Sequence, residues 1–237
     1  MKLCMIGTGY VGLVSGTCFA DIGNQVYCVD KDKNKIDKLN SGVSPIYEPG
    51  LDELIKKNFN ASRLIFTTDI KKAINSSDLI FICVGTPTKK GSLKADLSFV
   101  YKCVKEILKH TKKKKIIITK STVPVGTGDE IEKIIKKKKK LFSIISNPEF
   151  LREGEAIRDF RYPDRIVIGS DNKSEFKTMR KLYSPLISKG AKFFTTSRKG
   201  AELIKYASNA FLATKITFIN ELANLCEKTG INVEDIS

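Results

Sequence analysis

The chain has 237 residues, of which 41% are hydrophobic, so it can bury the core of one large domain and is neither disordered nor fibrous. No apolar run reaches the roughly 18 residues that cross a bilayer, and no signal peptide precedes the first predicted strand, so we expect a cytoplasmic protein without a membrane segment. One histidine and six scattered cysteines argue against zinc sites and Ser-His-Asp triads. We therefore expect no metal, reduced buried thiols, and acid–base chemistry carried by Glu, Asp, Lys or water.

The net charge of +16 makes nucleic acid a partner to consider. Many of the lysines, however, lie in two runs at residues 112–115 and 136–140, each between the end of a predicted helix and an apolar strand. Cations are favourable at a helix carboxyl terminus and remain solvated there. We interpret both runs as solvated connections and expect no nucleic-acid partner, while noting that a positive field would also attract an anionic nucleotide.

The first predicted strand, residues 3–6, ends in the turn GTGYVG at residues 7–12 and is followed by a helix start. In such a turn Gly7 adopts a positive φ, Gly9 leaves room for phosphate oxygens, and Gly12 lets the helix pack on the strand. The amino terminus of the helix then directs free N–H groups at the anion. The pattern predicts a site for the pyrophosphate of a dinucleotide, although an ordinary strand–turn–helix is the alternative.

The next predicted strand, residues 25–29, supports the dinucleotide interpretation. Asp30 closes this strand 18 residues after Gly12, where a ribose-binding carboxylate is expected. A carboxylate there accepts a hydrogen bond from the ribose 2′-hydroxyl and repels a 2′-phosphate, which favours NAD over NADP. Lys31 and Lys33 weaken this preference without reversing it.

A regular alternation of helices and strands follows. Helices are predicted at 33–39, from 51, at 70–75, 97–110 and 126–137, and strands at 64–67, 78–84, 115–119 and 141–146. The strands are almost wholly apolar, as in a parallel sheet covered on both faces. The sequence therefore predicts an α/β fold with a doubly wound, parallel Rossmann-type sheet and ligand loops at the strand carboxyl ends.

Two loops at that edge are rich in small hydroxyl residues, namely 85–88 (GTPT) after the fourth strand and 121–126 (STVPVG) after the fifth. Such residues can simply cap helices and form turns. Their shared placement beside the predicted nucleotide makes cofactor binding at least as good an interpretation.

The sixth strand runs into the segment NPEFLREG at residues 147–154. If Pro148 opens a helical turn, Glu149 and Glu153 are four residues apart and face the same way. Two carboxylates at the mouth of a nucleotide site suit general-base or water-positioning work; the alternative is an ordinary acidic first turn. Beyond this segment we expect strands at 165–169 and 192–195 on either side of a helix at 173–183.

A helix of some 30 residues is predicted from Lys199 to about Thr229, ending near Gly230. Its first half is apolar nearly all round, which predicts burial on several sides. Lys205 and Asn209 interrupt it at four-residue spacing. Because a buried lysine needs a compensating anion or ligand, one face of the helix is expected to line a site, unless both side chains extend to solvent.

Together, GTGYVG, PIYEPGLDEL, GTPT, KSTVPVGT, NPEFLREG and ELIKYASNAFLATKI resemble, in order and spacing, the UDP-glucose/GDP-mannose dehydrogenase family across essentially the whole chain. The resemblance implies a Rossmann-type NAD-binding domain at residues 1–197, and the start of a central helical region that forms a homodimer at 198–237. It also implies oxidation of a nucleotide sugar at C6, from alcohol to carboxylate, with two NAD and a cysteine thiohemiacetal and thioester. NPEFLREG favours UDP-glucose, with GDP-mannose and N-acetylated UDP-sugars left open.

The resemblance also assigns roles to individual residues. The residues that it places against NAD are Gly7, Gly9, Tyr10, Val11, Gly12, Asp30, Lys35, Thr86, Thr122 and Glu153. Those that it places at the catalytic centre are Thr122, Glu149, Glu153, Lys205 and Asn209, with Glu149 in acid–base steps and Lys205 and Asn209 at the oxyanion. Those that it places around the sugar are Glu149, Phe150, Leu151, Arg152, Glu153, Lys205 and Asn209.

One departure from the family pattern concerns the nucleophile. In the family the cysteine lies in a GGSCFPKD-like motif beyond the long helix, followed by a second domain that holds the nucleotide, and this sequence contains neither. Cys226 lies on the helix with no glycine turn to expose it. We therefore expect the amino-terminal part of such an enzyme, inactive alone, with an NAD-binding remnant without turnover as the alternative.

Overall fold

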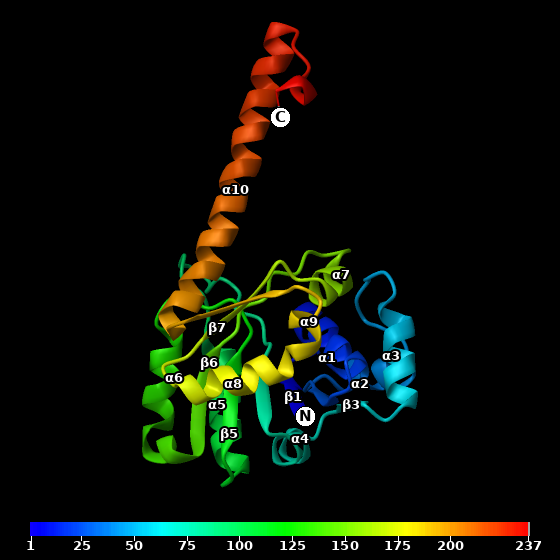
Figure 1. Ribbon diagram of the computed structural model, residues 1–237, viewed down its shortest axis with the longest axis vertical. Coiled ribbons are helices and arrows are strands. Elements are labelled where there is room, and N and C mark those ends of the chain that lie inside the picture. Colours follow the sequence, from blue (N-terminus) through cyan, green and yellow to red (C-terminus); the bar gives the residue numbers. More distant parts are fainter. Residues whose placement is uncertain (237) are drawn as a thin grey trace.

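The computed structural model describes residues 1–236, apart from the side chain of Lys139; Ser237, the last residue of the predicted central region, lies outside the described residues. Its centre is a single sheet of eight strands in the order β3-β2-β1-β4-β5-β6-β7-β8 (Figure 1). The strands are β1 (Lys2–Ile6), β2 (Gln25–Val29), β3 (Leu64–Thr67), β4 (Leu79–Ile82), β5 (Lys115–Thr119), β6 (Phe142–Ser146), β7 (Arg165–Gly169) and β8 (Lys192–Thr196). The first six are parallel in the order 3-2-1-4-5-6, which confirms the doubly wound prediction.

The last two strands extend the same sheet in the opposite direction. β7 meets β6 in antiparallel orientation through one residue pair, Ser146 opposite Gly169, and β8 then pairs with β7 in parallel. The two additional predicted strands are confirmed. β6 and β7 pair only at their carboxyl-terminal residues. β7 therefore runs toward the ligand edge of the sheet in the direction opposite to β6.

The helices cover both faces of the sheet. They are α1 (Tyr10–Asp21), α2 (Lys33–Asn40), α3 (Leu51–Asn60), α4 (Ile70–Ser76), α5 (Ser98–His110), α6 (Thr127–Ile135), α7 (Ala156–Arg161), α8 (Lys173–Leu182), α9 (Ser184–Ile187) and α10 (Arg198–Thr229), with short 3-10 turns η1 (Lys136–Leu141) and η2 (Val233–Asp235). One apolar core joins the sheet to α1, α2, α3, α7, α8 and α9, and a second joins it to α4, α5 and α6. The almost wholly apolar strands are thus buried on both sides.

The cysteine prediction is confirmed, and one residue departs from the interpretation of the lysine runs. All six cysteines are buried and unbridged. Residues 112–114 are exposed, whereas Lys115 is buried within β5, where its ammonium group donates to the backbone oxygen of Ser77. That residue belongs to the strand rather than to the connection, which corrects the interpretation of the first run as wholly solvated.

The long helix α10 projects away from the sheet (Figure 1), so the predicted burial of its first half is wrong for this chain. Only its first turns contact β6, β7 and α6, and Arg198, Ala201, Glu202 and Lys205 are its buried residues there. Farther along, large apolar side chains are open to solvent; Phe211, for example, is 67% exposed. No helix among residues 1–236 is long and apolar enough to cross a membrane.

Candidate active site

The glycine-rich turn after β1 has the backbone geometry that its sequence predicts. Gly7 has φ of +101°, and a Cβ there would lie 2.8 Å from the backbone oxygen of Cys83. A Cβ on Gly12 would lie 1.9 Å from the Gly7 oxygen, so the helix could not pack as closely. No heavy atom lies within 4 Å of a Cβ built on Gly9, which precedes α1 without any side-chain cap. The space in front of the first turn of α1, beginning at Tyr10, therefore fits a phosphate group.

Asp30 lies beside this turn at the end of β2. Its Oδ2 accepts hydrogen bonds from the backbone N–H of Thr8 (3.0 Å) and from the Thr8 hydroxyl (2.8 Å), and it pairs with Lys35 (3.2 Å). Burial by itself would raise the pKa of Asp30, but the hydrogen bonds from Thr8 and Asp32 outweigh it and hold the pKa below its ordinary value. Asp30 is thus a carboxylate at neutral pH.

The lysines near Asp30 are engaged in different ways. Lys35 pairs with Asp30 itself, whereas Lys33 pairs with Asp37 (2.6 Å) and Lys31 lies over the ring of Phe99. Lys31 and Lys33 thus contact groups other than Asp30, and the preference for NAD over NADP stays a prediction.

The two hydroxyl-rich loops meet at the carboxyl edge of the sheet. The Thr86 hydroxyl donates to the backbone oxygen of Thr122 (2.7 Å), and the Ser121 hydroxyl donates to the backbone oxygen of Val84 (2.6 Å). Both loops are thus tied to each other across β4 and β5. The Thr86 and Ser121 hydroxyl groups thus bond to the backbone, and the contact of these loops with a cofactor stays a prediction.

The segment after β6 has no helical turn at Pro148, so the expectation that Glu149 and Glu153 share a helix face is wrong. The segment stays irregular until α7 begins at Ala156. Glu149 turns inward and accepts the backbone N–H of Leu151 (2.6 Å), whereas Glu153 is exposed. The two carboxylates therefore occupy different environments.

Lys205 of α10 reaches Glu149 and forms a buried ion pair with it. The Nζ atom lies 3.0 Å from Oε1 of Glu149, and the two side chains are 9% and 11% exposed. The same ammonium group lies 5.3 Å from the centre of the Phe150 ring. The buried lysine thus has the compensating anion that its burial requires, and its place in a ligand site stays a prediction, while Asn209, one turn on, is exposed.

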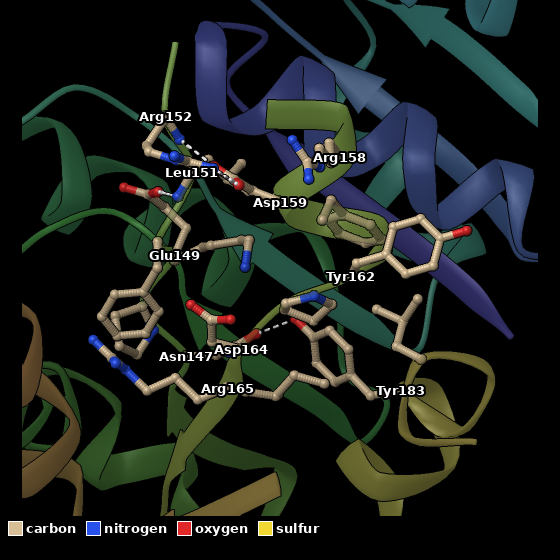
Figure 2. A pocket seen from close by; sticks show the side chains of 17 residues that line it. Asn147, Glu149, Leu151, Arg152, Arg158, Asp159, Tyr162, Asp164, Arg165 and Tyr183 are labelled. Carbon is tan, nitrogen blue, oxygen red and sulfur yellow. Dashed lines mark hydrogen bonds and ion pairs between the residues drawn. The ribbon is translucent and has the colours of Figure 1, made fainter. Parts of the chain in front are cut away.

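A pocket of about 610 Å³ adjoins this pair (Figure 2). Four of the predicted sugar-site residues line it, namely Glu149, Phe150, Leu151 and Arg152. Arg152 extends along one wall and forms an ion pair with Asp159 (2.7 Å), and the Tyr183 hydroxyl donates to Asn147 (2.6 Å) across another. The pocket thus combines an apolar ring, a carboxylate and several cations at the strand ends.

Residues 1–187 match the model of the UDP-glucose/GDP-mannose dehydrogenase family, NAD binding domain, and residues 199–237 match the central domain of the same family. The chain belongs to this family. The Rossmann-type fold and the NAD cofactor expected from the glycine turn are those of the family.

Curated relatives and solved structures agree with this membership. The chain is 54% identical to the UDP-glucose 6-dehydrogenase of Rhizobium meliloti (strain 1021) over 242 residues, which covers 100% of the chain and 55% of the relative. It is 51% identical to UDP-glucose 6-dehydrogenase TuaD of Bacillus subtilis, again over 100% of the chain and 51% of the relative. The chain therefore spans about half the length of the curated relatives that it matches.

Two solved structures share the fold closely. The GDP-mannose dehydrogenase of Pseudomonas aeruginosa, solved as a ternary complex, has a TM-score of 0.93 at 37% identity, over 100% of this chain and 55% of that one. The UDP-glucose dehydrogenase of Pyrobaculum islandicum has a TM-score of 0.92 at 35% identity, over 99% and 55% of the two chains.

One residue that the sequence analysis did not assign to the site, Glu48, connects its parts. Glu48, in the proline-bounded loop before α3, is buried and accepts the backbone N–H groups of Gly154 (2.9 Å) and Ala156 (2.8 Å). The Tyr10 hydroxyl also donates to it, and burial together with this bond raises the pKa of Tyr10. Glu48 thus joins the cofactor turn to the segment that carries Glu149. Its motif, PIYEPG, was visible in the sequence, but its partners were not.

The base of α10 holds two further residues that sequence reasoning missed. The buried Glu202 accepts the N–H groups of Gly126 (2.7 Å) and Gly128 (2.8 Å), so it caps α6 directly after the Thr122 loop. Burial raises the pKa of Glu202 although these bonds oppose the shift. Arg198 pairs with Asp129, Glu132 and Asp171, the one cluster of carboxylates among the described residues with metal-binding geometry. A guanidinium group already balances that cluster.

Proposed function

We propose that residues 1–237 supply the cofactor domain and part of the catalytic site of an NAD-dependent UDP-glucose 6-dehydrogenase. The reaction converts the C6 alcohol of UDP-glucose to the carboxylate of UDP-glucuronate with two NAD. The name of the 54% identical relative from Rhizobium meliloti supports this substrate. The alternative substrate is another nucleotide sugar, GDP-mannose or an N-acetylated UDP-sugar, because a solved GDP-mannose dehydrogenase has a similar structure.

The observation that carries this proposal is the buried pair of Lys205 and Glu149. It brings an ammonium group and a carboxylate within 3.0 Å of each other at the edge of the sheet where the glycine turn also lies. Oxidation of an alcohol requires a group that removes the hydroxyl proton and a group that stabilises the developing alkoxide. The two side chains provide both.

NAD accepts the hydride from C6 when it is bound. The turn at Gly7–Gly12 and the amino terminus of α1 would hold its pyrophosphate, and Asp30 would bind a ribose hydroxyl. In our proposal the Lys205 ammonium stabilises the oxyanion at C6, assisted by Asn209, and Glu149 carries protons to and from water. Phe150 and Leu151 exclude solvent along the sugar.

The nucleophile of the second oxidation is not supplied by the cysteines of this chain. All six are buried, and burial raises the pKa of Cys83, which lies beside the site, to about 12. A thiol so held is inert, because the thiolate is the reactive form. This observation favours, as a second candidate, an NAD-binding protein without turnover.

The remaining parts of the proposal concern boundaries and partners. We place the domain boundary at residue 197, before α10, with the central region at 198–237. The exposed apolar side chains of α10 support a homodimer through this helix. We interpret the lysine runs at 112–114 and in η1 as solvated connections, and we propose no nucleic-acid partner and no metal.

A chimera tests the function directly. Residues 1–237 are joined to the part of the Rhizobium meliloti relative that follows the aligned region, and NADH formation with UDP-glucose is followed by absorbance. The chimera should turn over, and the 237-residue chain alone should not. Glu149→Gln and Lys205→Met should each lower kcat by about 100-fold, the usual scale for a lost acid–base or oxyanion group.

The matched control is Glu155→Gln, which removes an exposed carboxylate from the same segment and should leave kcat within about twofold. An inactive chimera that nevertheless binds NAD would favour the second candidate. Turnover by the 237-residue chain that Cys226→Ala abolishes would instead make Cys226 an unexpected nucleophile.

A further inference from the structure

Lys120 is a buried cation of the pocket to which neither the sequence analysis nor the proposed function assigns a role. It is the first residue after β5, its backbone N–H donates to the oxygen of Ile82 (3.0 Å), and it is 4% exposed. It lines the pocket of Figure 2 together with Glu149 and the residues of the predicted sugar site. Its place is fixed by the sheet, because residue 120 follows the strand directly.

Within residues 1–236 the ammonium group of Lys120 forms no hydrogen bond or ion pair, although its nitrogen is not among the fully enclosed polar atoms that lack a partner. Its ionisable neighbours are the thiol of Cys83 and the carboxylate of Glu149, and the latter is already paired with Lys205. Burial consequently lowers the pKa of Lys120. A buried, unpaired ammonium group destabilises a fold, so this side chain is unlike the paired charges around it.

A second cation of the pocket also has no carboxylate partner among the described residues. The Arg165 guanidinium lies 4.5 Å from the centre of the Phe150 ring and donates to the Ser208 hydroxyl (3.1 Å). Arg152, by contrast, is paired with Asp159. The pocket therefore contains two cations without a carboxylate partner, of which Lys120 is the more buried, and the carboxylate of Asp164 also lines it.

We propose that Lys120 binds the carboxylate of a sugar acid, so that the pocket holds a uronate product more tightly than the alcohol from which it forms. This inference rests on the proposed function, which supplies a carboxylate at C6. A hydroxyl group offers Lys120 a neutral acceptor, whereas a carboxylate accepts the same hydrogen bond and also neutralises the ammonium charge. The unpaired charge is a cost to the free protein that the product offsets.

Two simple sugars test the inference on the 237-residue chain. D-glucuronate and D-glucose differ only at C6, and titration calorimetry compares their affinities. Wild-type protein should bind D-glucuronate at least tenfold more tightly than D-glucose. Lys120→Met should reduce this ratio to within about twofold, while Lys112→Met, which removes an exposed lysine outside the pocket, should leave it unchanged.

Thermal unfolding separates a ligand-binding role from a structural one. Lys120→Met should unfold at a higher temperature than wild type without ligand, because it removes a buried unpaired charge, and D-glucuronate should stabilise only the wild type. Earlier unfolding of the variant would overturn the proposal, as would equal affinities for the two sugars, no binding of D-glucuronate, or selectivity that survives the substitution.

NAD titrations on the same samples keep this inference distinct from the proposed function. NAD binding without selectivity for D-glucuronate rejects the role of Lys120 and leaves the proposed dehydrogenase standing. A wild-type protein that binds D-glucuronate selectively but not NAD rejects the proposed dehydrogenase and leaves an acid-binding pocket.

Discussion

Replacing Lys205 by Met should destabilise the fold by about 3 kcal/mol, because the substitution leaves the Glu149 carboxylate buried without its partner. The two charged atoms lie 3.0 Å apart. At an effective dielectric constant of about 20, unit charges at this separation attract by about 5.5 kcal/mol, an upper bound from which the desolvation of both ions is subtracted. The backbone N–H of Leu151 still donates to Glu149 in the variant, which keeps the loss at the lower end of the range for broken buried pairs.

Urea unfolding of a double-mutant cycle measures this contribution. Lys205→Met and Glu149→Gln should each lower the free energy of unfolding, and the double variant should recover part of the loss, with a coupling of at least about 1.5 kcal/mol. Lys215→Met is the matched control on the exposed part of α10 and should change stability by less than about 0.5 kcal/mol. Strictly additive single substitutions, or a Lys205→Met variant as stable as the control, would refute the reasoning.

Two further predictions concern the cofactor and the assembly. NAD should bind at least about tenfold more tightly than NADP, a difference of roughly 1.4 kcal/mol, and Asp30→Ala should remove the preference; equal affinities in wild-type titrations would mean that Asp30 has been misassigned. Because the pKa of Asp30 is lowered, its carboxylate is fully ionised above its ordinary pKa, and titration of Asp30 should not change the affinity for NAD between about pH 5 and 8. The chain should self-associate at tens of micromolar in light scattering, and Phe211→Glu should make it monomeric, whereas Leu93→Glu, at an exposed apolar residue of a distant loop, should not. A wild-type monomer would contradict a dimer through α10.

Much of the fold could be predicted because its signals are local. Each strand is a short apolar run, and the turn at residues 7–12 requires glycine for reasons within the turn itself, namely the positive φ of Gly7 and the contact that Gly12 makes with it. Asp30 was located from spacing alone. The family resemblance assigned roles to individual residues such as Glu149. The periodicity of the sequence carries no information on such roles.

What failed depended on contacts between distant residues. Nothing local indicates that Glu48 accepts the N–H groups of Gly154 and Ala156, 106 and 108 residues away, at the start of α7. The exposed length of α10 was mispredicted because a hydrophobic pattern shows that a surface must be covered without showing which molecule covers it.

Because α10 is attached to the sheet only at its first turns, movement of its far end is transmitted to Lys205. Its buried charges lie within the first two turns, whereas the helix continues for about 36 Å beyond Lys205 at 1.5 Å per residue. If it pivots at Arg198, a 4 Å displacement near Thr229 would become about 1 Å at Lys205, enough to stretch its ion pair with Glu149 from 3.0 Å to about 4 Å. A restraint that limits movement of the far end of the helix therefore limits movement of Lys205 to about one quarter of that distance.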